Sequence, residues 1–530
     1  MEELDFGKDS PIRKLKANGY IIENEKILTV KEREVCLSLI EPIGIYENVI
    51  NGKEVICLGY KKDNKWKQIL IPQEKIANAN KLIELAGYGI PVSSMSTSVL
   101  SKYLIDLVAF NRDMLPRGKS ISKMGWYDEK FIPYDTDVIY DGEECFKAAF
   151  ESLKEKGSFD LWKDWMSVVR NNIVVRLLMG ASVASVLLKL LNKKPFVTLV
   201  WGTTGDGKTV AAMCAMSIWG NPTEGHLQFS MNNTDNYYYR TAEFMNNLPC
   251  FFDELQTYRG DLDRLIMGLT EGMDRGKAKA DGGVETLKKW QNTFILTGEQ
   301  TASTINSGGG TLNRLIEINT SGKIISDGFR VVSVIANNYG FAGKKIINYI
   351  KENGLFISTV YKNNLDALIE NSNTEEKQAQ NMALIKTADD LLRICIFNEE
   401  KELDIEELSQ FMFTKEEINV SERAWEFISN EFANNIKNFT GEGRENWGKC
   451  ELDDVYVNKN VLEKILLNNR FSPQKMFREW SKNGRLIKDT GKGYSIHASV
   501  RGAKGHYIHL KMELEDNEIG GKSEGSNRIF

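Results

Sequence analysis

The sequence predicts an α/β protein whose middle part is a parallel sheet covered by helices. Three observations predict this class. Residues 196–320 alternate apolar strand-like runs with helical segments, which is the pattern of a parallel sheet. Residues 15–75 alternate short β-like runs with turn signals, and residues 456–511 follow the order helix, turn, helix, β-hairpin. We therefore expect an α+β unit before the parallel sheet and a winged helix after it.

The expected boundaries follow these changes of pattern along the chain. The predicted units are an N-terminal β-rich and helical domain (1–112), a helical connector (113–192), the α/β core (193–325), an acidic helical lid region (326–436), a winged-helix domain (437–512) and a disordered tail (513–530). The sign of the charge changes near the last boundary. Residues 363–431 hold 17 Asp/Glu and 6 Lys/Arg, whereas residues 456–511 hold 12 Lys/Arg and 3 Asp/Glu.

Composition places the chain among multidomain globular proteins. Its 530 residues are too many for one core, and its 42% apolar and 27% charged content is ordinary. A net charge of −5 excludes a protein whose whole surface attracts nucleic acid. The seven cysteines show no CxxC spacing, which favours reduced thiols and no structural zinc.

Two stretches of the chain bear on membrane association, and neither predicts it. The N-terminal stretch lacks the apolar core of a signal peptide. The most apolar stretch, 173–191, carries Arg176 and Lys189 and is interpreted as a buried helix. We expect a cytoplasmic protein.

A glycine-rich loop follows the first apolar strand of the core. The run "GTTGDGKT" at 202–209 fits G-x-x-x-x-G-K-[ST], in which backbone N–H groups cradle phosphates at a helix N-terminus. Lys208 is expected to reach the β- and γ-phosphates, and Thr209 to offer its hydroxyl to Mg²⁺. The predicted cofactors are ATP and Mg²⁺. The predicted nucleotide-binding residues are Gly202, Thr203, Thr204, Gly205, Asp206, Gly207, Lys208, Thr209 and Val210.

An acidic pair ends a second apolar run. In "LPCFFDEL", Asp253 lies 45 residues after Lys208 and is followed by Glu254. We expect Asp253 to hold Mg²⁺ through water and Glu254 to polarise the attacking water. An adjacent Glu is typical of ATPases that do mechanical work, which disfavours a kinase or a GTPase.

A third strand and a later arginine complete the predicted catalytic set. The run "NTFILTGE" ends in polar residues, and either Thr297 or Glu299 is a candidate for sensing the γ-phosphate through the attacking water. Arg314 follows 17 residues after Thr297, where ring ATPases carry an arginine that reaches the neighbouring subunit's site. The alternative is a surface arginine before a strand. The arginine-finger interpretation predicts a homo-oligomer.

Residues 271–290, between the acidic strand and the sensor strand, predict a hairpin with a basic edge. Arg275, Lys277 and Lys279 recur with period two and share one face of an extended strand. In a ring ATPase an insertion here points to the pore, where such an edge would follow the phosphates of a single DNA strand. The alternative is a solvated charged face.

The predicted winged helix carries its own basic residues. Lys475, Arg478 and Lys482 form a stripe at helical spacing, and Arg501 and Lys504 lie near the hairpin tip. We expect contact with duplex DNA, with a protein-binding winged helix as the alternative.

Several longer stretches resemble one known family. They include "GWYDEKFIPYD", "VWGTTGDGKT", "AMSIWGNP", "EGMDRGKAKADG" and "NNYGFAGKKIINYI", within about 120–400. The chain resembles a family of bacterial and phage P-loop proteins, long known only as a domain of unknown function, that includes the Cch-type self-loading helicases of staphylococcal cassette chromosomes. Those are AAA+ proteins similar to the MCM replicative helicases.

The resemblance implies a hexameric ring helicase with an N-terminal collar, an AAA+ P-loop motor and a winged helix. Lys208, Thr209, Asp253 and Glu254 match the motor's nucleotide residues. The sensor strand ends in "TGE" where MCM proteins usually have asparagine, so Thr297 and Glu299 remain alternatives, and Arg330 is a weak candidate for the sensor-2 arginine.

Three functions follow from these patterns. The first is an ATP-dependent DNA helicase for replication of a mobile element or phage. The second is an initiator or loader that remodels DNA without processive unwinding, and the third is an ATP-gated scaffold. For the N-terminal domain, a DNA-binding collar and an oligomerisation module fit equally well.

Overall fold

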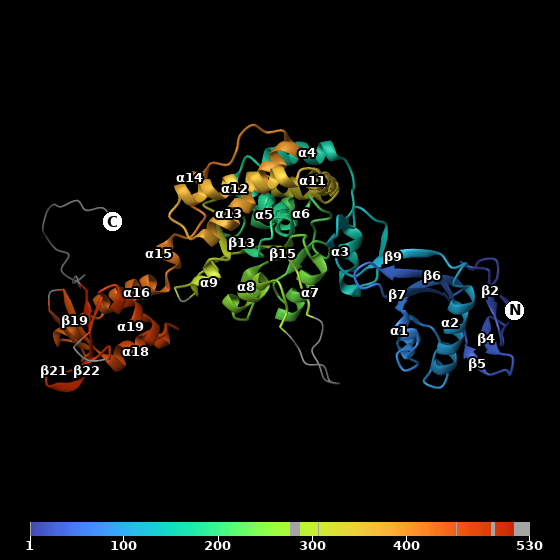
Figure 1. The fold of residues 1–530 in the computed structure, drawn as a ribbon, viewed down its shortest axis with the longest axis horizontal. Coiled ribbons are helices and arrows are strands. Elements are labelled where there is room, and N and C mark those ends of the chain that lie inside the picture. The colour runs from blue at the N-terminus through green and yellow to red at the C-terminus, as the bar shows by residue number, and fades with distance from the viewer. Residues whose placement is uncertain (1, 276–286, 306, 452, 489–492, 513–530) are drawn as a thin grey trace.

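The chain forms three units in a row, each with its own apolar core. The computed structural model describes residues 2–275, 287–305, 307–451, 453–488 and 493–512. The three cores are built from residues between Leu4 and Leu115, between Ile121 and Met412, and between Ala424 and Met512. Figure 1 shows an elongated molecule with the largest unit in the middle and the other two at its ends.

A five-stranded sheet with one covering helix forms most of the N-terminal unit. Its strand order is β12-β9-β6-β7-β8, in which β6, β7 and β8 are antiparallel and β9 and β12 join in parallel. Helix α2 (Thr97–Asn111) buries Leu100, Leu104 and Leu107, which lie on one face at spacings of four and three. Tyr103 on the same helix donates to the Ile40 carbonyl of β6 at 2.9 Å.

Two small sheets, β1-β2 and β3-β4-β5, complete this unit. Its elements are β1 (Glu2–Asp5), β2 (Lys14–Ala17), β3 (Tyr20–Glu23), β4 (Lys26–Thr29), β5 (Glu34–Cys36), β6 (Ile40–Asn48), β7 (Glu54–Lys62), β8 (Lys65–Pro72), α1 (Gln73–Ile76), η1 (Leu82–Tyr88), α2, β9 (Arg117–Ile121) and β12 (Val138–Tyr140).

Residues 113–192, predicted as a helical connector, are shared between two units. Strands β9 and β12 extend the N-terminal sheet, whereas the hairpin β10-β11 and the following helices contribute to the middle core. These elements are β10 (Gly125–Tyr127), β11 (Lys130–Ile132), η2 (Glu144–Phe146), α3 (Lys147–Ser152), α4 (Phe159–Val169) and α5 (Ile173–Leu190).

The middle unit is built on a parallel five-stranded sheet with the order β14-β15-β16-β13-β17. Strand β13, "FVTLVW", is buried along its length because helices cover both faces of the sheet. Strand β16 lies between β13 and β15, so the carboxyl ends of these three strands meet at one edge. The strands are β13 (Phe196–Trp201), β14 (Gln228–Ser230), β15 (Cys250–Asp253), β16 (Thr293–Gly298) and β17 (Leu315–Asn319).

Helix α5 is the central helix of the layer on one side of this sheet. Figure 1 shows α5, α6 and α13 above the strands and α7 and α8 below them. By length and composition α5 is apolar enough to cross a membrane, but 83% of it is buried inside the protein, as predicted for 173–191. The surrounding helices are α6 (Lys208–Met216), α7 (Asp235–Met245), η3 (Leu255–Thr257), α8 (Leu262–Glu271), α9 (Gly309–Leu312), α10 (Gly328–Ile335), α11 (Phe341–Glu352), α12 (Gly354–Asn371), α13 (Glu376–Leu392), η4 (Arg393–Phe397), α14 (Ile405–Ser409) and α15 (Lys415–Ile418).

A buried ion cluster joins α5 to α13. Asp389 is fully buried and accepts from Arg176 of α5, with Nε at 3.1 Å, while the Arg170 guanidinium lies 3.0 Å from its other oxygen. Removing this carboxylate takes a buried negative charge away from Arg170 and Arg176, which then lack a partner for part of their positive charge. We expect Asp389→Ala to lower the free energy of unfolding of the middle unit by about 3–5 kcal/mol.

Hydrogen exchange of α5 and α13 in urea measures this loss. Glu143→Ala is the matched control, because its ion pair with Arg240 is roughly half exposed on both sides and is expected to change stability by about 1 kcal/mol or less. Equal effects of the two substitutions would contradict the prediction.

The C-terminal unit includes one helix more than its predicted boundary allows. Helix α16 (Val420–Asn434) falls in the region predicted as lid, but Ala424, Ile428 and Phe432 lie in the third core. The Trp480 indole donates to the Ser421 carbonyl at 3.1 Å, which ties α16 to α19. The remaining elements are α17 (Lys437–Thr440), β18 (Gly448–Glu451), β19 (Asp454–Asn458), α18 (Lys459–Asn468), α19 (Pro473–Lys482), β20 (Leu486–Ile487), β21 (Ile496–Val500) and β22 (Ala503–Lys511).

Candidate nucleotide-binding site

The glycine-rich loop connects the end of β13 to the start of α6, as its sequence predicts. Gly202 has a φ of +152°, and a Cβ there would lie 2.0 Å from the Thr320 hydroxyl, so the close approach requires glycine. Gly207 caps α6 with a φ of +95°. Asp206 fixes the loop from the outside, because its carboxylate accepts from Thr320 at 2.7 Å and its carbonyl from the Ile324 N–H at 2.8 Å.

Lys208 lies folded against this loop. Its side chain is buried, and its ammonium group donates to the carbonyls of Gly202 at 2.9 Å and Thr203 at 2.7 Å. These are weak neutral acceptors, which the charged oxygens of a bound phosphate would outcompete. The N-terminus of α6 adds its dipole and free N–H groups at the same place.

Asp253 is the centre of a hydrogen-bond cluster at the end of β15. Its carboxylate accepts from the Thr209 hydroxyl at 3.0 Å and from the Gln228 amide at 2.8 Å, and it also accepts from the Thr297 hydroxyl. Three neighbouring elements therefore aim donors at one carboxylate.

The oxygens of Thr209 and Asp253 suit a magnesium ion. Mg²⁺ prefers oxygen ligands and usually keeps several waters, so one or two protein ligands and phosphate oxygens suffice. Among the described residues, no group of three or more His, Cys, Asp or Glu side chains stands together that could hold a metal ion on its own. The donor set thus fits a metal that arrives with a phosphate ligand.

Glu254 projects from an uncommon backbone conformation. Its φ is +65°, a left-handed conformation that costs free energy for a residue other than glycine and is found often at functional sites. Its N–H donates to the Thr297 hydroxyl at 3.4 Å, and its side chain is exposed to the cleft. Thr297 therefore joins Asp253 to Glu254.

Glu299, the other candidate sensor, faces the loop instead. Its carboxylate accepts from the Thr204 hydroxyl at 2.5 Å. Thr297 and Glu299 both line the cleft, so both remain candidates for sensing the γ-phosphate.

A cleft of about 570 Å³ collects these residues at the carboxyl edge of the sheet. Three residues in or beside this cleft could not be predicted from the sequence. Gln228 orients Asp253 from β14, and Lys323 and Phe329 come from the segment after β17. Phe329 is 90% exposed although it is large and apolar. These residues are distant in sequence from the loop and belong to no motif. The full lining is Thr204, Gly205, Gly207, Lys208, Thr209, Val210, Asp253, Glu254, Gln256, Thr297, Gly298, Glu299, Lys323, Ile325, Gly328, Phe329 and Val332.

Arg314 lies at the opposite edge of the sheet from the cleft. Its carbonyl accepts from the N–H of Val197, at the start of β13, whereas the glycine-rich loop follows the end of that strand. At 3.3 Å per residue, roughly 16 Å of strand separate the two ends. Arg314 therefore does not serve the cleft of its own chain.

Two buried amides of α13 hold the Arg314 segment. Gln378 donates to the Leu315 carbonyl at 2.8 Å and also to that of Leu312, and Asn381 donates to the Asn313 carbonyl at 3.1 Å. Arg330, the weak sensor-2 candidate, has its guanidinium 5.5 Å from the Trp165 ring and does not line the cleft.

Only one of the three basic residues predicted at the pore hairpin can be located. Arg275 is exposed and lies two residues beyond Met273, which bridges to Lys289. Lys277 and Lys279 lie outside the described residues. The predicted DNA contacts of this segment stay a prediction.

The basic residues predicted in the C-terminal unit are exposed on two elements. Lys475, Arg478 and Lys482 lie on α19, and Arg501 and Lys504 lie at the turn between β21 and β22. Pro473 is the first residue of α19, and the Ser472 side chain makes no capping hydrogen bond.

Glu479 offsets part of this positive charge. It accepts from Arg478 at 3.1 Å and lies 3.5 Å from the Lys482 ammonium group. The hydrogen bond from Arg478 and the charge of Lys482 lower the pKa of Glu479. The stripe on α19 is therefore less basic than the spacing of its cations predicts.

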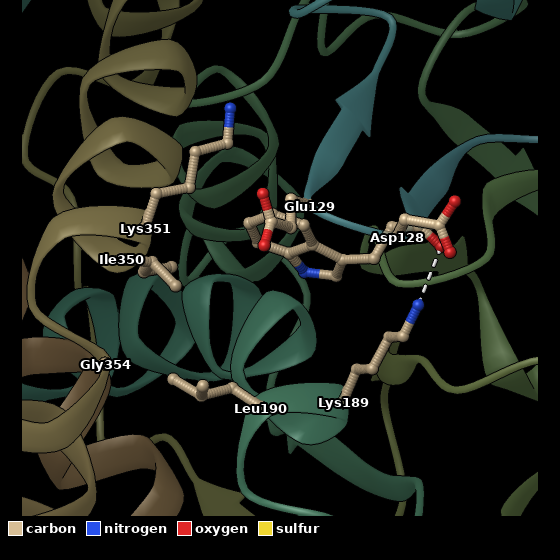
Figure 2. A pocket seen from close by; sticks show the side chains of 8 residues that line it. Asp128, Glu129, Lys189, Leu190, Ile350, Lys351 and Gly354 are labelled. Carbon is tan, nitrogen blue, oxygen red and sulfur yellow. Dashed lines mark hydrogen bonds between the residues drawn. The ribbon is translucent and has the colours of Figure 1, made fainter.

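A second pocket of similar size contains none of the predicted site residues. It has a volume of about 580 Å³ and lies between the β10-β11 turn, the end of α5 and the start of α12 (Figure 2). Its lining residues are Trp126, Asp128, Glu129, Lys189, Leu190, Ile350, Lys351 and Gly354.

The fold and the cleft thus define an α/β protein with a glycine-rich strand-to-helix loop, an acidic strand end opposite it and a C-terminal helix-turn-helix. The family model of a domain of unknown function, DUF927, matches residues 15–289, which is more than half of the chain. The chain belongs to the DUF927 family. The model of the Cch helix-turn-helix domain matches residues 419–515, a range that includes α16.

Solved structures include one with the same fold. The structure described as the active helicase Cch of SCCmec type IV is similar over 94% of this chain and 98% of that chain, with a TM-score of 0.67 and 21% identity. A structure of the C-terminal region of NrS-1 in its apo A form aligns over 70% of this chain and 90% of that chain at 12% identity, with a TM-score of 0.26, too low to carry an argument. No curated protein matches the chain.

These findings confirm the resemblance to Cch-type proteins that the motifs predict. They also confirm the coarse fold class, a mixed α/β protein with a parallel sheet and a C-terminal helix-turn-helix.

Proposed function

We propose that this protein is an ATP- and Mg²⁺-dependent AAA+ DNA helicase, MCM-like and ring-shaped, that unwinds DNA for replication of a mobile element or phage. One observation carries the proposal: Lys208 at the start of α6 and the adjacent Asp253 and Glu254 at the end of β15 line one cleft. The fold shared with a structure described as an active helicase supports the same function.

In this proposal each residue of the cleft has one task in ATP hydrolysis. Lys208 leaves the carbonyls of the loop and binds the β- and γ-phosphates. Thr209 and Asp253 would hold Mg²⁺, and that ion would supply positive charge beside the phosphates. Glu254 orients and polarises the attacking water, while Thr297 or Glu299 senses the γ-phosphate through that water.

The position of Arg314 supports a ring. An arginine at the amino edge of the sheet cannot reach its own cleft, but a head-to-tail neighbour can bring it to the next one. A closed ring of such contacts, a hexamer in this proposal, completes every site with a guanidinium from the adjacent subunit.

DNA is the proposed partner at two places. Arg275, with Lys277 and Lys279, would hold one strand in the pore, and the helix-turn-helix would contact duplex DNA through Lys475, Arg478, Lys482, Arg501 and Lys504. Because Glu479 already pairs with Arg478, Lys475 and the hairpin-tip residues carry more of the proposed duplex contact.

Strand displacement from a forked duplex with ATP and Mg²⁺ tests the proposal. Wild type is expected to unwind the fork, and Glu254→Gln to bind ATP but lose hydrolysis and unwinding by about 10³-fold, because the amide cannot polarise water. If wild type hydrolyses ATP but displaces no strand from forks with either overhang, the helicase proposal is wrong and the initiator or loader function is favoured. If wild type does not hydrolyse ATP, the ATP-gated scaffold would be the remaining function of the three.

A further inference from the structure

A groove rich in lysine lies near the amino edge of the central sheet. It has a volume of about 510 Å³, and within the described part of the chain its lining holds five lysines and one carboxylate, Glu271. We call it the lysine groove and define it by Lys123, Lys189, Lys193, Lys194 and Lys289. We infer that the lysine groove binds the sugar-phosphate backbone of a single DNA strand, an inference that rests on the proposed function.

The groove is held in shape by amide side chains. Gln291 donates to the Lys193 carbonyl at 2.7 Å and to the Leu188 carbonyl at 3.0 Å, which fixes the loop between α5 and β13. Asn246 donates to the Met124 carbonyl at 3.1 Å, and Asn247 accepts from the Trp126 N–H at 3.1 Å. These hydrogen bonds fix the backbone of segments that are far apart in sequence, so the lysines project from defined positions before any ligand arrives.

The charge in the groove is only slightly compensated. Glu271 lies 3.8 Å from the Lys194 ammonium group, with both side chains more than half exposed, a weak pair. Lys189 donates to the Trp126 carbonyl at 2.9 Å, and Figure 2 shows it extending from the end of α5 toward the β10-β11 turn. Lys193 lies 5.0 Å from the Tyr361 ring. These partners leave a surplus of positive charge that suits a polyanion.

The same positive field extends past the groove. Burial lowers the pKa of Lys377, and the nearby charges of Arg314, Lys193 and Lys194 lower it further. The part of the lowering that comes from these three cations, as distinct from burial, indicates positive potential around Lys377.

Position and chemistry point to a single strand as the occupant. Lys289 lies at the base of the segment 271–290 and pairs through its backbone with Met273, two residues before Arg275. A strand held by Arg275 would therefore pass close to the lysine groove. Trp126 is partly buried and lies beside the lysines in the lining, and lysines with an aromatic ring are the combination that binds single-stranded nucleic acid without sequence preference.

The test uses the full chain and the oligonucleotide (dT)30. Lys123→Ala/Lys194→Ala removes two lysines that lie outside the pore hairpin. Each phosphate contact contributes about 0.7 to the salt slope of single-strand binding, so the slope is expected to fall by about 1.4 and the affinity by about tenfold. Lys344→Ala/Lys362→Ala, exposed lysines of α11 and α12, is the matched control and is expected to bind like wild type.

Lysine acetylation of the wild-type protein gives an answer that does not depend on the variant folding. With (dT)30 bound, Lys123, Lys194 and Lys289 are expected to react at least about fivefold more slowly, and Lys344 and Lys362 at their usual rate. Equal reaction rates with and without DNA overturn the inference, as does protection by duplex but not by (dT)30, or protection by self-association alone.

The two proposals fail separately in these experiments. Protected groove lysines in a protein that does not unwind a fork sustain the lysine groove and reject the helicase. The opposite result rejects the lysine groove alone: wild type unwinds the fork, its groove lysines are not protected, and the salt slope of Lys123→Ala/Lys194→Ala equals that of wild type.

Discussion

Lys208→Ala is expected to weaken ATP binding by about 100-fold or more, equivalent to about 2.8 kcal/mol. In the proposed site the ammonium group makes charge-assisted hydrogen bonds to two phosphates, and each such bond contributes about 1.5–3 kcal/mol. Titration with a fluorescent ATP analogue and Mg²⁺ measures the change.

Lys323→Ala is the matched control for this prediction. Lys323 is the other lysine lining the cleft, but it is exposed and lies outside the glycine-rich loop. Its loss is expected to weaken binding by less than about tenfold, because an exposed charge is screened by solvent. Wild-type affinity in Lys208→Ala, or a larger loss in Lys323→Ala, would contradict the assignment of the loop.

The loss in Lys208→Ala should not come from unfolding. Within the described part of the chain, the ammonium group donates to the carbonyls of Gly202 and Thr203, and Lys208 lines the cleft, so water from the cleft can take its place. Hydrogen exchange of α6 is therefore expected to stay near its wild-type rate.

Residues that act within one local pattern could be predicted from the sequence. The glycine-rich loop is such a case, because its spacing is set by the phosphate and its flanking strand and helix are contiguous with it. Asp253 and Glu254 could be placed because they end an apolar strand, and a parallel sheet brings strand ends together.

Residues whose role depends on tertiary neighbours could not be predicted. Gln228 reaches Asp253 only because β14 lies beside β15, and no sequence pattern gives that order. Gln378 and Asn381 hold the Arg314 segment from a helix more than 60 residues later. Glu479 is different, because it pairs with Arg478 and Lys482 of its own helix; its effect is local, and a count that includes only the cations of that helix face omits it.

The boundary of the C-terminal unit failed for a related reason. Acidic composition continues through α16, so the charge pattern assigns this helix to the lid region, whereas its apolar face packs in the third core. Burial, not surface charge, decides which unit a helix joins.

Arg314→Ala is expected to lower the rate of ATP hydrolysis by about 10³-fold while ATP affinity changes by only a few fold. A guanidinium that meets the γ-phosphate of a neighbouring subunit stabilises charge that develops mainly in the transition state, so its loss affects turnover more than binding. Arg330→Ala is the matched control, because that guanidinium lies over Trp165 and outside the cleft, and it is expected to keep near wild-type turnover.

Mixing two inactive variants tests whether Arg314 acts between subunits. Arg314→Ala supplies an intact loop, and Lys208→Ala supplies an intact arginine. In a randomly mixed ring, about a quarter of the interfaces pair one with the other in the productive order, and hydrolysis should return at those sites. Because Arg314 lies across the sheet from its own cleft, action within one chain would need that edge to be rebuilt. A mixture as inactive as its two components, although both variants assemble together, would reduce Arg314 to a surface arginine and remove the main argument for a ring.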